Sequence, residues 1–287
     1  MSTAVLPVLA LLFNALVWGL SWIAFKALHG QGLHPLWATA LTYGGALALL
    51  LAWRPAGPRQ VRERPWLLLL AASAGLTNVG FNWGVTIGDV MRVVLLFYLM
   101  PAWSILLAWW LLGERPTAAA LLRLVLALAG VALVLWRPSA AQAPAQPVLA
   151  DGLALMAGFC FALTNTLLRR WRGAPAQARA LAMFGGACVM PAALALLLPA
   201  AGALPALHWG WAPWALLLGV AFLSGNLALQ YGAARLPAQT TSLIMLSEVV
   251  FASVSAVALG AAWPGAATWA GGALIVLAAL LAVLRGR

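Results

Sequence analysis

The feature that most constrains this chain is a succession of long apolar stretches separated by short polar interruptions. An α-helix needs about 20 apolar residues to cross the hydrocarbon layer of a bilayer. Charged residues make up only 7% of the 287 residues, whereas soluble domains carry roughly 25%. The sequence therefore predicts an all-α integral membrane protein.

Segmentation at charges and at proline and glycine clusters predicts about ten transmembrane helices. Their expected ranges are 5–25, 35–53, 66–87, 91–112, 118–136, 151–170, 179–198, 212–232, 238–260 and 266–284. The longest polar interruption, from Arg137 to Gln146, is rich in Pro, Ala and Gln. We therefore expect a first five-helix unit at 1–137, a linker at 138–150 and a second five-helix unit at 151–287.

The basic residues lie mostly between the apolar stretches rather than in one stripe. This distribution indicates membrane orientation and not a nucleic-acid surface, because basic loops stay in the cytoplasm. Placing the N-terminus inside leaves only Lys26, Arg92 and Arg137 on the outside. We therefore expect both termini to be cytoplasmic. Cys160 and Cys188 lie inside apolar stretches, so we expect neither a disulfide nor a metal site.

One stretch of the first half recurs in the second. Pro65–Leu70 reappears as Pro213–Leu218, and the same offset carries Asn78 and Asn82 onto Asn226 and Gln230. The two stretches stand five predicted helices apart, so they cross the membrane in opposite senses. This arrangement predicts an inverted repeat of the kind found in secondary transporters, with a site near the midplane between the repeats.

Two segments resemble a known family. Asn14 to Lys26 reads NALVWGLSWIAFK, and a helix that follows Pro101 ends in LGERP at Pro116. Together with the repeat, these segments resemble the EamA-type branch of the drug/metabolite transporter superfamily, and within it the YddG-type aromatic amino acid exporters. The resemblance covers essentially the whole chain. It implies ten helices in two inverted five-helix repeats and an inner-membrane carrier that releases amino acids and related amphipathic compounds.

The second half departs from this pattern at two points. Glu248-Val249 stands where the first half has Met100-Pro101, and Ala261-Ala262 stands where it has Gly113-Glu114. The proline-kinked geometry and the Gly-Glu turn are therefore not expected in both halves.

Glu248 is the only acid near the middle of a predicted helix. An ionisable side chain at membrane depth costs roughly 2.5 to 3.5 kcal/mol, so it should face the protein interior. Helical spacing places it on one face with Thr241, Met245 and Ser255. Two interpretations remain open: a proton acceptor or anchor for a substrate ammonium, or a protonated carboxyl that bonds a neighbouring helix.

Interior amides and aromatic side chains complete the candidate solute-binding set. The pairs Asn78/Asn82 and Asn226/Gln230 are each one helical turn apart, and they could bind a solute or hold helices together. Lys26 could snorkel to the head groups or attract a solute carboxylate at the outer mouth. The remaining candidates are Asn14, Trp18, Ser21, Trp22, Tyr98, Phe161 and Asn165.

These patterns predict a secondary transporter that exports small amphipathic metabolites, chiefly neutral and aromatic amino acids, by alternating access. The alternatives are an exporter of cationic drugs or other metabolites, and a channel-like facilitator. An enzyme is not expected, because the predicted spans contain no Asp/Glu pair, His cluster or Ser with a nearby base. We expect no cofactor and no nucleic-acid partner, only a small solute and the lipid bilayer. The oligomeric state does not follow from the sequence.

Overall fold

The computed structural model describes residues 5–53, 57–113, 115–135, 147–171, 173–202, 209–233, 235, 244–245, 247–260 and 263–284. Within these ranges the chain is helical and contains no strand. The α-helices are α1 (Val5–Gly30), α2 (Pro35–Trp53), α3 (Gly57–Arg62), α4 (Leu67–Ile87), α5 (Val90–Phe97), α6 (Met100–Leu112), α7 (Ala118–Leu135), α8 (Pro147–Arg170), α9 (Ala176–Leu197), α10 (Ala212–Ala233), α12 (Ser247–Ala258) and α13 (Ala266–Leu284). Two short 3-10 helices, η1 (Pro199–Ala201) and η2 (Trp209–Trp211), precede α10.

Six of the described segments are long and apolar enough to cross a membrane. They are Val5–Gly30, Pro35–Ala52, Val90–Leu112, Val148–Leu168, Gln177–Leu197 and Trp209–Leu229. Three shorter apolar helices are Ala118–Leu133, Ser247–Ala258 and Ala266–Ala278. The helices agree with the prediction of an all-helical membrane protein.

The predicted helix at 91–112 is not continuous. It is divided into α5 and α6 by a turn at Tyr98–Leu99. Pro101 follows in the first turn of α6. Because proline has no N–H, the helical hydrogen bond from residue 101 to the carbonyl of Phe97 cannot form. The loss of that bond explains why the helix ends here, although the residues on both sides are apolar.

Two further boundaries differ from the prediction. α8 begins at Pro147 rather than at 151, and residues 138–146 of the predicted linker lie outside the described residues. Of the predicted helix at 238–260, the structure describes residues 244–245 and 247–260, of which Ser247–Ala258 form α12. Thr241, which the sequence placed on one face with Glu248, lies outside the described part of the chain.

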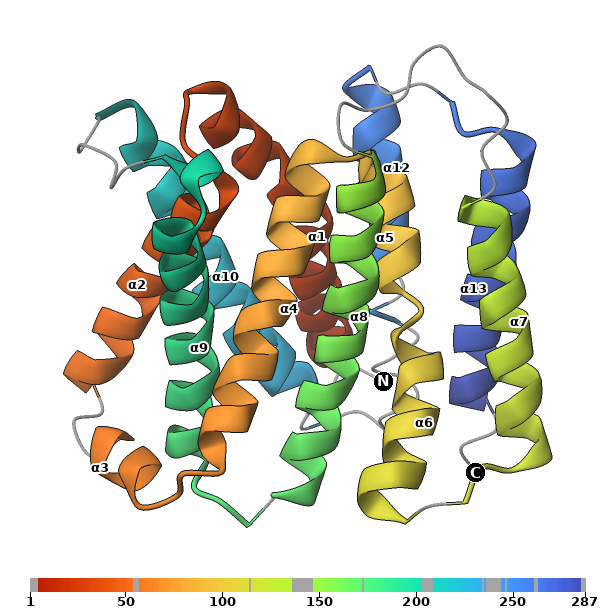
Figure 1. Cartoon of the computed structure of the whole chain (residues 1–287), viewed down its shortest axis with the longest axis horizontal. Helices are drawn as coiled ribbons and strands as arrows, with labels where there is room; N and C mark the ends of the chain where they lie inside the picture. The colour runs from red at the N-terminus through yellow and green to blue at the C-terminus, as the bar shows by residue number, and fades with distance from the viewer. Residues whose placement is uncertain are drawn as a thin grey trace.

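The first helix of each half of the chain packs against helices of the other half. α1, from the N-terminal half (α1 to α7), packs against α10 and α12, whereas α8, from the C-terminal half (α8 to α13), packs against α4, α5 and α6 (Figure 1). Other pairs between the halves include α4 with α9, α2 with α9, α7 with α13, α2 with α10 and α5 with α12. Segments far apart in the sequence therefore build every part of the helix bundle.

Glycines allow the closest of these helix crossings. A side chain on Gly158 of α8 would lie 2.6 Å from the carbonyl oxygen of Phe97, at the end of α5. A side chain on Gly19 of α1 would lie 2.9 Å from the carbonyl oxygen of Glu248, at the start of α12. Small residues at crossings are typical of membrane helices, since they let two backbones approach. The end of α5 and the start of α12 thus each lie against a glycine in the first helix of the other half.

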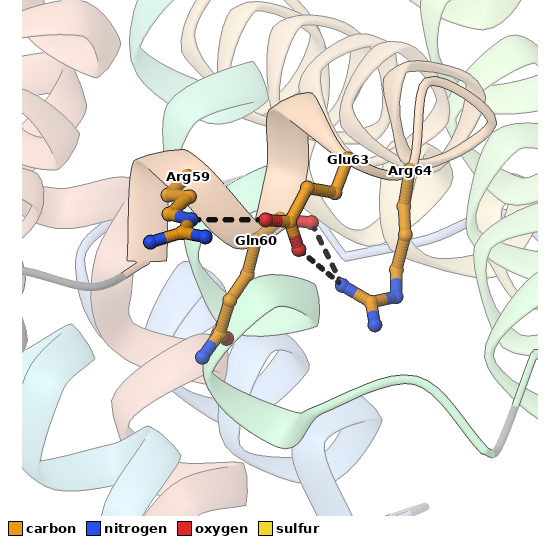
Figure 2. Close-up of polar contacts among 4 residues, drawn as sticks. All are labelled: Arg59, Gln60, Glu63 and Arg64. Atoms are coloured by element: carbon orange, nitrogen blue, oxygen red, sulfur yellow. Dashed lines mark hydrogen bonds and ion pairs between the residues drawn. The ribbon is translucent and has the colours of Figure 1, made fainter.

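The short helix α3 lies at the lower edge of the bundle as drawn in Figure 1, where it connects α2 to α4 and packs against α9. Figure 2 shows its charges: Arg59 Nε lies 3.0 Å from Glu63, and Arg64 lies 3.6 Å from the same carboxylate. Both contacts are solvent-exposed, so they contribute only about 0 to 1 kcal/mol each. The helix therefore presents excess positive charge at this edge.

Candidate functional site

The turn that separates α5 from α6 contacts Glu248 at the start of α12 and Met245 just before it. Tyr98 lies in that turn and is buried, and its hydroxyl oxygen is 3.0 Å from Oε2 of Glu248 and 3.1 Å from the backbone oxygen of Met245. Glu248 is also buried, with 6% of its surface exposed. This contact joins residues 150 positions apart and links the N-terminal half to the C-terminal half.

The hydrogen bonds among Tyr98, Met245 and Glu248 depend on whether Glu248 is protonated. A tyrosine hydroxyl has one proton to donate, and an ionised carboxylate can only accept. With Glu248 ionised, the single proton of Tyr98 must serve two acceptors. With Glu248 protonated, its O–H donates to Tyr98, and Tyr98 donates to the carbonyl of Met245. The geometry thus gives each of these three oxygens a hydrogen bond in the protonated state and leaves one acceptor without a proton in the ionised state.

The indole of Trp22 lies on the same side of α12. Its Nε1 donates to Oγ of Ser255 at 3.1 Å, and the ring is 8% exposed. Ser255 follows Glu248 by seven residues, or two helical turns, so both side chains lie on the same face of α12. The hydrogen bond to Ser255 fixes the orientation of the indole ring. The ring of Trp22 therefore keeps one position between α1 and α12.

A chain of aromatic rings crosses the bundle beside this contact. Trp18 stacks on Phe222 with centroids 4.7 Å apart, and Phe222 stacks in turn on Tyr43 at 5.5 Å. In the other direction Trp18 meets the edge of Phe81 at 6.1 Å, and Phe81 meets Phe97 at 4.9 Å. Each such pair contributes about 0.5 to 1.5 kcal/mol beyond its buried area. The chain ends at Phe97, which contacts both Tyr98 and Phe161.

The interior amides are only partly satisfied. Asn82 is fully buried and donates to Oγ1 of Thr39 on α2 at 3.2 Å, while Asn78 donates to the carbonyl of Ala74 at 2.9 Å within α4. The oxygens of both amides are buried without a partner. A buried carbonyl that lacks a partner costs about 1 to 3 kcal/mol. These oxygens therefore favour an additional hydrogen-bond donor, from a solute or from water.

Asn14 differs from the amides of α4. Both of its polar atoms are buried without a partner, and its Nδ2 would lie 3.2 Å from a side chain on Gly225 of α10. It therefore lies in the packed interface between α1 and α10. Asn226, next to Gly225, is partly buried on α10.

The structure does not bring every predicted residue into the central contact. Ser21 donates to the backbone oxygen of Trp18 within α1. Asn165 on α8 is exposed. Met245 contributes its backbone oxygen to the central contact. The residues that do lie together are Trp18, Trp22, Tyr98, Phe161 and Glu248, with the backbone of Met245.

Polar contacts also join the halves where α4 ends and α5 begins. Arg92 of α5 forms a two-bond ion pair with Asp151 of α8, at 2.7 and 3.0 Å, with only 14% and 12% of the side chains exposed. Lys26 lies nearby at 3.4 Å from the backbone oxygen of Gly88. The ammonium of Lys26 also lies over the ring of Trp22, 5.3 Å from its centroid.

Sequence analysis missed Phe81, Phe97 and Phe222, and it missed Asp151 as the partner of Arg92. Phenylalanines in an apolar helix carry no periodic signal that separates a cavity wall from a lipid-facing surface. Asp151 had a usable signal. It is one of five acids in the chain, and a carboxylate at a helix start within an apolar stretch requires a partner.

Comparison with known proteins agrees with this architecture. Residues 5–136 match the EamA-like transporter family. The chain is similar to a "Probable transport protein" of Saccharomyces cerevisiae, at 27% identity over 77% of this chain and 67% of that protein. It is also similar to a "Probable terminal-alkyne amino-acid exporter" of Streptantibioticus cattleyicolor, at 29% identity over 57% of this chain. The second match spans only 56% of the length of that exporter.

A solved crystal structure shares the fold. It aligns with a TM-score of 0.58 and 21% identity, covering 98% of this chain and 97% of that chain. This likeness supports the helical architecture over the full length. The EamA-type resemblance predicted from the sequence is confirmed: residues 5–136 match the EamA-like transporter family.

Proposed function

We propose that this chain is a secondary transporter that exports small amphipathic metabolites, chiefly neutral and aromatic amino acids, by alternating access. The family match and the names of the two relatives support transport in general. The solute class rests on the chemistry of the interior and, among the relatives, on the one named as an amino-acid exporter.

The proposal includes ten membrane crossings in two inverted five-helix repeats, at 1–137 and 151–287. Packing supports it. α4 packs on α8 and α10 packs on α1, and these four helices occupy corresponding places in the two halves. Gly84 and Gly232, which the repeat offset relates, face the starts of α8 and α1 respectively: a side chain on Gly84 would lie 3.5 Å from the oxygen of Ala150, and one on Gly232 would lie 2.9 Å from that of Pro7.

The observation that carries the proposal is the contact of Tyr98 with Glu248. Secondary transporters place their sites where discontinuous helices of the two repeats meet near the midplane. Here the break between α5 and α6 meets the start of α12, and the contact contains the buried acid. A single hydrogen-bonded contact between the halves can form in one conformation and break in the other. Because its hydrogen bonds depend on the protonation of Glu248, the contact allows proton coupling.

The interior favours a solute with an apolar body and a small polar head. The aromatic chain from Tyr43 to Phe161 offers stacking surface, and the amide oxygens of Asn78 and Asn82 offer uncharged acceptors. No cluster of basic side chains lies near Tyr98 in the described residues, so strongly anionic solutes such as sugar phosphates do not fit. The carboxylate of Glu248 is able to pair with a solute cation, and this ability supports the alternative of an exporter of cationic drugs.

The proposed location is the inner (plasma) membrane, with both termini cytoplasmic. The end of α13 lies on the lower side of the bundle in Figure 1, as does α3 with Arg59 and Arg62. Basic residues favour the cytoplasmic side. Single cysteines at Arg62 and at His208 should therefore label from opposite sides, with Arg62 reachable only from the cytoplasm.

Counter-flow in proteoliposomes tests the function. Vesicles loaded with unlabelled phenylalanine should accumulate labelled phenylalanine transiently and saturably, and methionine, leucine and tryptophan should compete. Discrimination should be modest, since one methylene changes binding by only about 1 to 3 kcal/mol. Flux without saturation or counter-flow would indicate a channel-like facilitator, and competition by dicarboxylates or sugar phosphates alone would contradict the proposed solute class.

A further inference from the structure

Lys26 is the only lysine in the chain, and it lies on α1 one helical turn after Trp22. Its side chain is partly buried. Its ammonium has one protein hydrogen bond in the described residues, a long one of 3.4 Å to the backbone oxygen of Gly88, together with the face of Trp22. Neither partner carries a negative charge.

The neighbouring cation, Arg92, differs from Lys26 because it has an anionic partner. Arg92 holds Asp151 through two short hydrogen bonds. Asp89, which follows Gly88, acts on Lys26 electrostatically but forms no ion pair with it. Instead, Oδ1 of Asp89 caps α5 by accepting the N–H of Arg92 at 2.8 Å. A partly buried ammonium without a contacting anion is unusual, because charges away from water are generally paired.

The position of the ammonium argues against snorkelling into the lipid head groups. It contacts the end of α4 and the ring of Trp22, and Trp22 is itself bonded to α12. A snorkelling side chain extends away from the protein toward the head groups, whereas Lys26 extends toward the space between α1, α4 and α12.

Glu248 and Lys26 lie along the same interface, the one between α12 and α1. Glu248 and Ser255 are separated by about 10 Å of helix, and Trp22 and Lys26 by about 6 Å. Since Trp22 is bonded to Ser255, the two charged groups stand too far apart for the two head groups of one α-amino acid to reach both. They therefore act on a solute in succession, the acid at the centre and the amine nearer the end of the path.

We propose that Lys26 is a second, outer subsite that binds the carboxylate of the exported solute as it leaves the central contact, with Trp22 as the adjoining stacking surface. The inference rests on the proposed function, and it adds a specific requirement. The solute must carry an anionic oxygen group. A solute that has the same apolar body without a carboxylate passes without the help of Lys26.

The test compares phenylalanine with phenethylamine, which has the same ring and amine but no carboxylate. The purified chain is reconstituted in liposomes as wild type, Lys26→Gln, Lys26→Arg and Arg59→Gln. Arg59 is the matched control, because it is an exposed basic residue whose ion pair lies at the surface of α3. The amount of folded protein is measured for each variant by size-exclusion chromatography.

Loss of a charge-assisted hydrogen bond should raise the half-saturating concentration of phenylalanine about tenfold or more in Lys26→Gln, with phenethylamine within about twofold. Lys26→Arg should keep the preference for phenylalanine, and Arg59→Gln should match wild type. Equal losses for the two solutes, or losses that follow the anionic lipid content of the vesicles, would overturn the inference and indicate a lipid contact. Failure of the proposed function would look different, because wild type itself would then show no counter-flow.

Discussion

The two places where a helix ends against the first helix of the other half are alike in backbone and different in chemistry. At one, the carbonyl of Phe97 lies over Gly158 of α8, and at the other, the carbonyl of Glu248 lies over Gly19 of α1. The first place carries a phenol and a proline, Tyr98 and Pro101, and the second carries an acid, Glu248.

The reinforcing contacts differ as well. α5 is held to α8 by the ion pair of Arg92 with Asp151, whereas α12 is held to α1 by the neutral hydrogen bond of Ser255 with Trp22. The comparison teaches that a close backbone approach at a glycine positions both helix ends, whereas side chains that differ between the two places supply the polar chemistry. The α5–α8 crossing should be the firmer one and the α1–α12 crossing the more easily opened.

The largest effect should come from filling the crossing itself. Gly158→Leu would place a side chain against the backbone oxygen of Phe97, which cannot move without displacing α5. We expect destabilisation by about 3 kcal/mol or more and little folded protein. Gly152→Leu is the control on the same helix, because no atom lies within 4 Å of the position its side chain would take. Thermal unfolding in detergent measures both, and equal Tm values would contradict the crossing.

The two reinforcing contacts should differ next. Asp151→Asn leaves the nearly buried guanidinium of Arg92 without its charge partner, which should cost about 2 to 4 kcal/mol. Ser255→Ala leaves the indole N–H of Trp22 unpaired and should cost about 1 to 2 kcal/mol. Glu63→Gln, in an exposed ion pair, should change stability by under about 1 kcal/mol. A larger loss from Ser255→Ala than from Asp151→Asn would reverse the proposed order of the two crossings.

A small effect on stability, together with a specific effect on transport, should come from the central contact. In a double-mutant cycle, Tyr98→Phe and Glu248→Gln should show a coupling energy of about 0.5 to 2 kcal/mol in unfolding. Glu248→Gln keeps the shape and the hydrogen bonds while removing the proton, so it should abolish the pH dependence of counter-flow and leave the folded amount unchanged. Unchanged transport with unchanged pH dependence would show that Glu248 only holds the helices together.

Hydropathy and charge were sufficient to predict most helix positions, because the solvent sets the length and composition of each crossing. The predicted 35–53 coincides with α2, and 266–284 coincides with α13. The break at Tyr98 could not be predicted from hydropathy, since apolar residues flank it on both sides. The proline at 101 was a local signal for it, because it removes one helical hydrogen bond.

The candidate site was less predictable, because it depends on tertiary packing. Tyr98 and Glu248 were each selected from their own helices, but no sequence pattern pairs residues so far apart. Asn165 was selected by its place in the repeat, and the structure leaves it exposed. Periodicity states which residues share a helix face, whereas only packing decides whether that face meets a helix, a cavity or lipid.

The central claim is that the space beside Tyr98 and Glu248 opens to one side of the membrane at a time. Met245→Cys, in a background with Cys160→Ala and Cys188→Ala, places one thiol beside this contact. A membrane-impermeant thiol reagent should label this cysteine when it is added to one face or to the other in separate experiments. Saturating phenylalanine should slow the reaction. A change of pH should alter which face reacts faster. Rapid labelling from both faces at once, unaffected by phenylalanine, or no labelling from either face, would contradict alternating access at this site.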